Sequence, residues 1–400
     1  MNTYNEIYHA SQADFQLIRP NAITQLPYSV ECGSRWRTYG SSSGWSSDVQ
    51  QSALGEHFER KHFYLDIPVN DKNRLSDSLT PQECGAFEEA LSQTSTGGLK
   101  TPLHLHLFDR TTVYRITDFT QCKVPTACIS ISECRDPIDN GFYPMRDTCG
   151  CSAHVSVEKA MLGALKENLE RQFLLRCWLT KTCTEQIGYN AACSILAHSA
   201  SLTLFKELKR TGELCILDLT DKRFPGNCIL LCYGNQTADA KVKYCAGMAY
   251  AATAGLALEK SIIELWQTFR FMLSVDSNHE SESGLQDPYL KHFLACNRYD
   301  TYRNITTCSE LENPKHSKRC TTPLTTQSLI HTIRDLGFNG YLYLSSTPFK
   351  QSHLHLCKYF SPNLFLHMNN AKNFNTHNIY SKPFRNDIIP TQSLSMVPFP

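Results

Sequence analysis

The pattern of hydrophobic and polar positions predicts helices and strands that alternate over most of the chain. Apolar residues with helical spacing predict helices at about 48–64, 85–95, 156–180 with further helix to about 209, 253–273 and 327–335. Short runs with many β-branched residues predict strands at about 112–118, 124–131, 214–219, 228–233 and 340–345. Strands that alternate with helices indicate a mixed fold, α/β or α+β.

Polar segments predict how the chain is divided. Residues 1–50 are polar and end in a run of Gly and Ser, so we expect an irregular N-terminal segment there. One main domain is expected over 51–390, with a loop rich in Asp, Pro and Gly at 135–150 and a variable, Ser- and Asn-rich insertion at about 275–325. Residues 391–400 are expected to form a Pro-containing C-terminal tail.

Composition excludes several classes of protein. Hydrophobic residues make up 41% of the 400 residues, which is enough for a packed interior and excludes a disordered chain. Lys and Arg number 39 against 38 Asp and Glu, so a net charge of +1 gives no general attraction to nucleic acid or to an anionic membrane. The most apolar stretch, 246–258, is too short to span a bilayer, and no secretory signal is visible. We therefore expect a cytoplasmic protein that binds neither nucleic acid nor membrane.

The 18 cysteines include no C-x-x-C pair, which argues against a zinc ribbon and a thioredoxin-type motif. In a cytoplasmic protein we expect them to be thiols.

Three helical segments, 52–60, 164–171 and 260–267, share one pattern of acids. Each places an acid at one position and an acid or amide three residues later, so both side chains lie on one helical face. A glycine precedes the first acid by 16 or 17 residues in each case, and these glycines are Gly40, Gly150 and Gly247. The spacing predicts internally repeated units in which a glycine turn leads into an acidic helix.

The acids have two interpretations. On a single helix such a pattern usually forms a solvated, salt-bridged face. Here bulky apolar residues separate the acids, and half-buried carboxylates need partners. Converging carboxylates repel one another unless cations lie between them, and Mg²⁺ prefers carboxylate oxygens, water and substrate phosphates. With Arg60, Arg171 and Lys260 nearby, the pattern predicts a Mg²⁺–nucleotide site, whose acids are Glu56, Glu59, Glu167, Glu170 and Glu264.

Gly150 begins a run of small residues that leads into the helix at 156–180. A helix N-terminus can hold a phosphate, and an ordinary helix entry capped by Ser152 or Ser156 is the alternative. The chain has no Walker A motif, no G-x-G-x-x-G and no kinase signature. A nucleotide site here must therefore be built on another pattern.

Several ordered motifs resemble the YcaO family. They are S-x-x-x-E-x-x-E-R at 52–60, G-C-S-A-H followed by A-L-x-E-x-x-E-R within 150–171, and D-x-T…P followed by G…E-x-x-Q within 218–267. The stretches GEHFERKHF, FYPMRDTCGCSAH, ELWQ, FLHMNN and MVPFP resemble most closely the cyclodehydratase subunits of microcin B-like azole synthetases. The resemblance runs from about residue 40 to the end and is weakest in 67–110 and 275–350.

The resemblance implies a non-Walker fold that binds ATP and Mg²⁺ and acts on a ribosomally made precursor peptide. In such enzymes a Cys, Ser or Thr side chain attacks the preceding carbonyl, ATP phosphorylates the resulting oxyanion, and loss of phosphate leaves a thiazoline or oxazoline. The partners implied are an E1-like subunit that binds the leader peptide and an FMN-dependent dehydrogenase that oxidises the rings. Thioamide or amidine formation, and a non-catalytic assembly subunit, are the alternatives.

The resemblance also implies roles for individual residues. The five glutamates named above fall on the family's metal-binding acids. The positions implied to hold phosphates or to support the acids are Ser52, Arg60, Ser152, Arg171, Lys260 and Gln267. In related enzymes a Pro-rich C-terminus reaches the active site, which implies a catalytic role for Pro400, although this tail keeps only one P-x-P pair. Ser152 stands where the family usually has glycine.

Two other groups of residues have weaker support. His104 and His106, and likewise the set His353, His355 and Cys357, have strand spacing and could ligate zinc, but alternating leucines favour half-buried strands. Cys149 and Cys151 lie near His154 and could suggest a nucleophilic thiol, yet with 18 cysteines some lie near a histidine by chance.

Overall fold

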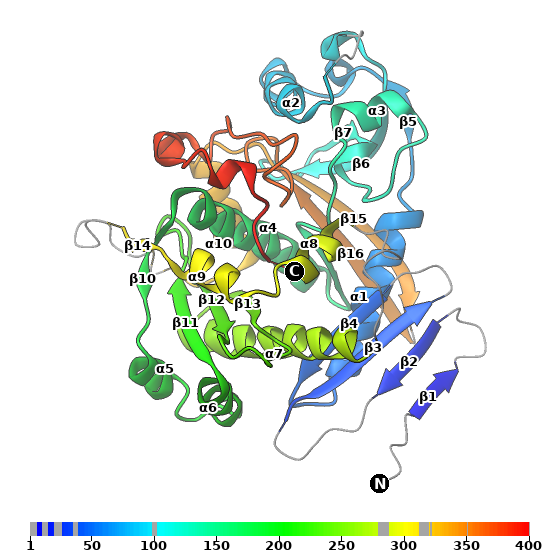
Figure 1. Ribbon diagram of the computed structural model, residues 1–400. Coiled ribbons are helices and arrows are strands. Elements are labelled where there is room, and N and C mark those ends of the chain that lie inside the picture. Colours follow the sequence, from blue (N-terminus) through cyan, green and yellow to red (C-terminus); the bar gives the residue numbers. More distant parts are fainter. Residues whose placement is uncertain are drawn as a thin grey trace.

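The computed structural model describes residues 6–9, 15–19, 26–34, 39–97, 102–278, 288–311, 320, 322–349 and 351–399. Helices and sheets are mixed, as the alternation of elements predicted (Figure 1). The helices are α1 (Val49–Leu65), α2 (Pro81–Thr94), α3 (Pro137–Phe142), α4 (Val157–Thr180), α5 (Tyr189–Ile195), α6 (Ser201–Thr211), α7 (Ala254–Asn278), α8 (Pro288–Ala295), α9 (Tyr299–Thr306) and α10 (Thr326–Asp335).

Three antiparallel sheets form the frame, and β14 (Ser309–Glu310) adds a short parallel pair with β9 (Thr182–Cys183). The first sheet has the order β1 (Glu6–His9), β2 (Phe15–Arg19), β3 (Tyr28–Ser34) and β4 (Tyr39–Gly44). The second has the order β10 (Glu185–Gln186), β11 (Glu213–Asp218), β12 (Asn227–Gly234) and β13 (Tyr244–Ala251). The third has the order β5 (Asp71–Asn73), β6 (Phe108–Arg115), β15 (Tyr341–Phe349), β16 (Ser352–Phe360) and β8 (Cys151–His154), with β7 (Gln121–Pro125) beside β6. Among the described strands, β4, β13 and β8 each lie at an edge.

Several elements differ from the sequence prediction. The region 1–50, expected to be irregular, contains strands β1–β4, and the Gly/Ser run becomes strand β4 because it pairs with β3. The strand expected at 124–131 ends at Pro125 and continues as a 3-10 turn at Thr126–Cys128. Strand β13 went unpredicted because its Ala- and Gly-rich sequence carries little β-branched signal. Part of the insertion expected at about 275–325 is helical, in α8 and α9.

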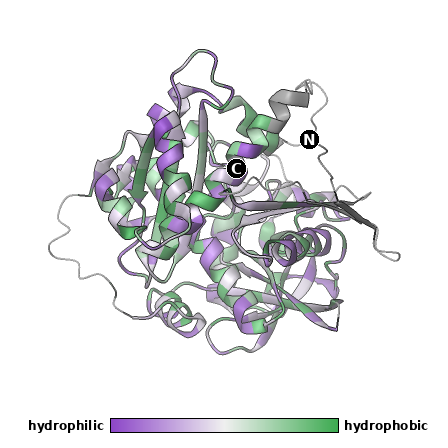
Figure 2. Ribbon diagram, turned by 90° about the horizontal axis from the view of Figure 1, so that it is seen from below, coloured by the Kyte–Doolittle hydropathy of each residue, from purple (hydrophilic) through white to green (hydrophobic). Residues whose placement is uncertain are grey.

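Helix α4 joins two of the sheets. Its N-cap is Ser156, whose side chain accepts a hydrogen bond from the amide of Lys159, and its C-cap is Lys181, which has a left-handed φ of 54°. The helix packs on β8 and β16 of one sheet and on β13 of another. Every residue from Gln172 to Thr180 is buried, so this half of the helix forms part of the main hydrophobic core. In Figure 2, purple and green residues alternate along the covering helices, as expected for elements with one polar and one apolar face.

Two of the three repeated glycines lie in strands rather than in turns. Gly40 lies in β4 and Gly247 in β13, whereas Gly150 lies in a turn with a φ of +75°. A Cβ atom on Gly40 would stand 2.3 Å from the carbonyl oxygen of Ala53 in α1. A Cβ atom on Gly247 would stand 2.2 Å from the amide nitrogen of Leu265 in α7. These glycines therefore let each helix approach the strand before it, and the prediction of turns was wrong for both.

No helix in the described ranges combines the length and the apolar character needed to cross a bilayer. All 18 cysteines are free thiols, as expected.

We predict that Gly247→Ala destabilises the protein by about 3 kcal/mol, because the added methyl overlaps the backbone of α7 and forces it from β13. The measurement is the midpoint of urea unfolding at unchanged m. Gly55→Ala in α1 is the matched control, since nothing lies within 4 Å of its Cβ position, and it should gain about 0.5–1 kcal/mol. Equal midpoints for the two variants would contradict the role given to Gly247.

Candidate active site

Strand β13 holds two of the predicted acids at its free edge. The amide of Met248 donates to Glu264 Oε2 over 2.8 Å, and the amide of Tyr250 donates to Glu170 Oε2 over 2.7 Å. Alternate amides of an edge strand point away from the sheet and need acceptors, which these carboxylates provide. Glu264 comes from α7 and Glu170 from α4, so the two helices meet at one strand edge.

Strands β4 and β8 hold the acids of α1 in the same way. The amide of Ser41 on β4 donates to Glu56 Oε2 over 2.7 Å. The carboxylate of Glu59 accepts a backbone hydrogen bond from Ala153 on β8. Main-chain amides at the edges of three sheets therefore position four of the five acids.

The five acids are here called the glutamate cluster, and four of them have a raised pKa. Burial and the charge of Glu56 raise the pKa of Glu59 to about 8. Burial, with the charges of Glu170 and Glu56, raises the pKa of Glu264 to about 8. Burial raises the pKa of Glu170, and burial with the neighbouring carboxylates raises that of Glu167 well above its ordinary value. The chain alone therefore leaves the negative charge of the cluster undercompensated.

Two arginines lie among these carboxylates. Arg60 Nη2 lies 2.6 Å from Glu56 Oε1, and Arg171 Nη2 lies 3.9 Å from Glu167 Oε1. Arg171 Nη1 is buried and has no hydrogen-bond partner among the described residues. A buried donor without an acceptor is costly, and a phosphate oxygen is a strong acceptor for a guanidinium. The unpaired nitrogen therefore fits an anionic ligand beside the glutamates.

Three lysines complete the electrostatic surroundings. The charge of Lys260 on α7 opposes the rise in the pKa of Glu170. Burial, together with the charge of Lys260, lowers the pKa of Lys166. Lys358 on β16 is buried, and its charge opposes the rise in the pKa of Glu59. Sequence reasoning missed Lys166 and Lys358. Nothing in the sequence marks Lys358, because the pairing of β16 with β8 brings it to the site.

The other three predicted ligand-binding residues occupy different settings. Ser52 is exposed on α1, one helical turn before the first acid of the cluster. Ser152 lies on β8, where its side chain fills the space beside Gly163 of α4. Gln267 donates from Nε2 to the hydroxyl of Ser41, so it links α7 to β4. Of these three, only Gln267 has a hydrogen bond to a residue that itself binds a cluster carboxylate.

The end of the chain lies beside Arg171. The ring centroid of Phe399 is 4.9 Å from Arg171 Cζ, in cation–π contact. The hydroxyl of Tyr244 donates to the carbonyl of Pro398 over 2.6 Å, and His292 Nε2 lies 3.2 Å from the carbonyl oxygen of Val397. Figure 1 shows this segment descending to the middle of the molecule near α8. Pro400 lies outside the described residues.

Two buried side chains fix the turn before that end. Asn370 Nδ2 donates to the carbonyls of Gln392 (2.9 Å) and Ser395 (2.7 Å), and its Oδ1 accepts from the amide of Val397 (2.9 Å). Trp178 Nε1 on α4 donates to the same two carbonyls. Asn370 belongs to the FLHMNN stretch, but sequence reasoning gave it no role. Its partners lie more than twenty residues away, so only the fold pairs them.

Within the described chain, neither the His and Cys sets considered for zinc nor the Cys149 and Cys151 pair considered for catalysis forms the site that the sequence suggested. His106 is buried and follows a 3-10 turn (Leu103–Leu105) rather than lying in a strand, whereas the second set does lie on β16. In the part of the chain that the structure describes, the one group of three metal-ligating side chains within 4.8 Å of one another is His106, Asp136 and Asp139. Burial raises the pKa of both Cys149 and Cys151, so these thiols stay protonated and are poor nucleophiles.

Comparisons with known proteins agree with the resemblance. The profile of the YcaO cyclodehydratase family, described as ATP- and Mg²⁺-binding, matches residues 48–365. The Microcin B17-processing protein McbD of Escherichia coli is 30% identical over 365 residues, which is 91% of this chain and 90% of that protein.

Solved structures give the same picture. A chain of the E. coli Microcin synthetase McbBCD complex superposes with a TM-score of 0.86 at 27% identity, covering 100% of both chains. YcaO from Methanopyrus kandleri, bound with AMPPCP and Mg²⁺, shares the fold at a TM-score of 0.54 and 12% identity, over 90% of this chain and 85% of that one. The family's description matches the expected cofactors, ATP and Mg²⁺. The protein is therefore a member of the YcaO family of cyclodehydratases.

Proposed function

We propose that this protein is the ATP-dependent cyclodehydratase subunit of an azole-forming synthetase. Its reaction converts Cys, Ser or Thr of a ribosomal precursor peptide to thiazoline or oxazoline. The observation that carries the proposal is the glutamate cluster, held at three sheet edges in a chain of the YcaO family. The 30% sequence identity to McbD, which extends over nine-tenths of both chains, supports a ribosomal precursor peptide as the substrate.

In this proposal the five glutamates hold Mg²⁺. The amide contacts occupy Oε2 of Glu56, Glu170 and Glu264. Glu170 and Glu264 each have a second oxygen for the ion, whereas Oε1 of Glu56 pairs with Arg60. The carboxylates are buried and repel one another, so the site favours the binding of divalent cations, which prefer carboxylate oxygens. When bound, ATP would supply the phosphoryl group, and Mg²⁺ would neutralise the charge that develops on that group during transfer.

The basic residues then bind and orient the phosphates. Arg171 offers a buried, unpaired Nη1, and Arg60 and Lys260 lie on the neighbouring helices. Ser52 and Ser152 lie at the start of α1 and on β8, where we propose supporting contacts to the nucleotide. Gln267 acts on the site through Ser41, by holding the strand that positions Glu56.

The tail and the partners complete the proposal. We propose that 391–400 places its end, with Pro400, beside the reacting groups, as the contact of Phe399 with Arg171 supports. The main domain of this proposal spans 51–390.

The proposed partners are the precursor peptide, an E1-like leader-binding subunit and an FMN-dependent dehydrogenase, since a solved E. coli relative is the McbBCD complex with pro-MccB17 bound. Eighteen free thiols support a cytoplasmic location.

The deciding experiment measures ATP hydrolysis by the co-purified complex with and without precursor peptide, and follows peptide mass in parallel. Peptide-dependent hydrolysis with loss of one water per ring supports the cyclodehydratase. Hydrolysis without water loss would indicate thioamide or amidine formation instead. No hydrolysis in an intact, peptide-bound complex would indicate a non-catalytic assembly subunit.

Replacing one metal ligand tests the glutamate cluster. We predict that Glu167→Gln lowers peptide-dependent ATP hydrolysis and ring formation together, by roughly 100-fold or more, because loss of a preorganised charge acts on the transition state. Glu207→Gln on the exposed face of α6, where Glu207 pairs only with Arg210 among the described residues, is the matched control and should keep full activity. Retained activity in Glu167→Gln would remove the basis for this assignment.

Stability should depend on pH in the metal-free chain. Glu59 and Glu264 have a pKa near 8 when folded and near 4.5 when unfolded, so the folded chain binds more protons in between. Stability from this cluster is therefore present below about pH 4.5 and falls as the pH rises towards about 8. Mg²⁺ binds the ionised carboxylates, so its affinity should rise across the same window.

Thermal unfolding at about pH 6 and about pH 8.5, with and without Mg²⁺, measures this effect. The gain in Tm from Mg²⁺ should be larger at the higher pH. Glu59→Gln/Glu264→Gln should flatten the pH dependence of the metal-free chain. An unchanged pH dependence in this double variant would contradict the coupling.

A substitution at Asn370 tests whether its hydrogen bonds position the C-terminal tail. Asn370→Asp keeps the size of the side chain but loses the two Nδ2 bonds to the carbonyls of Gln392 and Ser395. We expect ring formation to fall by about 100-fold through misplacement of the tail, at nearly unchanged overall fold. Asn304→Asp, an exposed change on α9, is the control. Wild-type ring formation by Asn370→Asp would show that the tail needs no such positioning.

A further inference from the structure

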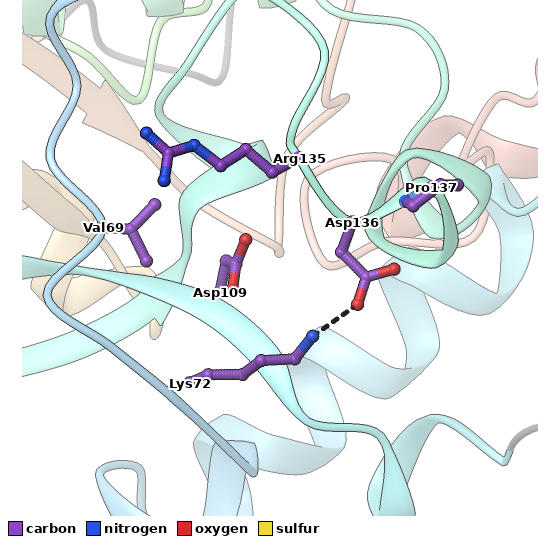
Figure 3. A pocket seen from close by; sticks show the side chains of 6 residues that line it. All are labelled: Val69, Lys72, Asp109, Arg135, Asp136 and Pro137. Carbon is purple, nitrogen blue, oxygen red and sulfur yellow. Dashed lines mark hydrogen bonds and ion pairs between the residues drawn. The ribbon is translucent and has the colours of Figure 1, made fainter.

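A second polar site lies beside α3, where β5 and β6 form an edge of the six-stranded sheet. It is a pocket of about 450 Å³ lined by Val69, Lys72, Asp109, Arg135, Asp136 and Pro137 (Figure 3). In Figure 1 this region lies at the top right, apart from the end of the chain at the centre. None of the residues proposed for the nucleotide lines it.

Three potential metal ligands meet beside this pocket, and one of them, Asp136, lines it. One ligand atom each of His106, Asp136 and Asp139 lies within 4.8 Å of the other two. His106 Nε2 lies 2.6 Å from Asp139 Oδ1, and Asp139 is fully buried. Asp136 caps α3 through the amide of Ile138 and also faces the pocket, so it connects the buried pair to solvent.

Asp109 provides an independent indication that this pocket can bind a cation. Its residue is only 9% exposed, and among the described residues its carboxylate has no hydrogen bond and no ion pair. Figure 3 shows this side chain lining the pocket beside the ion pair of Lys72 with Asp136, which measures 2.7 Å. A buried carboxylate without a partner is costly.

The charges do not balance in this region. Among the described residues Lys72 pairs with Asp136 and also faces the carboxylates of Asp109 and Asp139, and the imidazole of His106 pairs with Asp139. Arg135 lines the pocket but is exposed and, within the described chain, forms no ion pair. Within the described chain, Lys72 is therefore the one permanently charged side chain that forms an ion pair with these three carboxylates.

We propose that His106, Asp136 and Asp139 bind a divalent transition-metal ion, with Asp109 or a water from the pocket as fourth ligand. One imidazole with carboxylates is a ligand set that suits Zn²⁺, and four-coordinate Zn²⁺ takes N and O ligands at about 2.0–2.2 Å. The ion replaces the proton between His106 and Asp139, which is released, and displaces the ammonium of Lys72 from Asp136. The bound ion fixes α3 to the edge of the sheet. This site is independent of the proposed ATP chemistry.

The test is a titration of the full-length chain with Co²⁺, a spectroscopic probe for zinc sites, in excess Mg²⁺ so that the glutamate cluster is occupied. We expect one ion per chain with the visible bands of four-coordinate Co²⁺ and no thiolate charge-transfer band in the near ultraviolet. Asp136→Asn should weaken binding by tenfold or more. Lys72→Met should strengthen it several-fold, because Lys72 competes for Asp136.

His104→Ala is the matched control, since His104 is exposed and outside the group, and it should bind as the wild type does. The urea midpoint of Asp136→Asn is compared with that of the wild type, so that weaker binding is separated from unfolding. Equal affinity of wild type and Asp136→Asn, a thiolate band, or an effect of Lys72→Met in the opposite direction would overturn the proposal. The last result would leave His106 and Asp139 as a structural hydrogen-bonded pair.

Discussion

The hydrogen bonds between edge-strand amides and glutamates are the interaction on which the arrangement of this protein depends. Strands β4, β8 and β13 end three separate sheets, and an edge strand leaves alternate amides without a backbone partner. Carboxylates from α1, α4 and α7 accept hydrogen bonds from these amides and so satisfy the strand edges. One set of contacts thus satisfies the strands, fixes the helices and gathers negative charge in one place.

The gathering of charge has an energetic cost that the fold must balance. Burial and mutual repulsion raise the pKa of several carboxylates, so the metal-free chain keeps protons where ions are proposed to bind. The cost is tolerated because α4 is anchored by a long buried segment, Gln172–Thr180, which begins directly after the acids. Stable packing of the C-terminal part of α4 allows an electrostatically unfavourable site just before it.

The end of the chain shows how distant segments build one site. Asn370 and Trp178 hold the turn at Gln392–Leu394, and from there the chain continues to Phe399 on Arg171. Buried amide and indole donors to main-chain carbonyls position the backbone without depending on the side chains that follow. The tail can therefore keep its course even though it has only one P-x-P pair.

The sequence by itself determined the acidic helices, three of the basic residues among them (Arg60, Arg171 and Lys260) and the family, because these follow from local spacing and residue type. It did not determine the first sheet, since the Gly/Ser run of β4 becomes a strand only when β3 pairs with it. Nor did it determine that Gly40 and Gly247 lie in strands packed against helices, that Lys358 and Ser41 lie beside the acids, or that Asn370 holds the tail. Those placements depend on strand pairing and on contacts between residues far apart in sequence. Tertiary structure alone decides them, because a residue's neighbours across a sheet edge leave no periodic signal in its own segment.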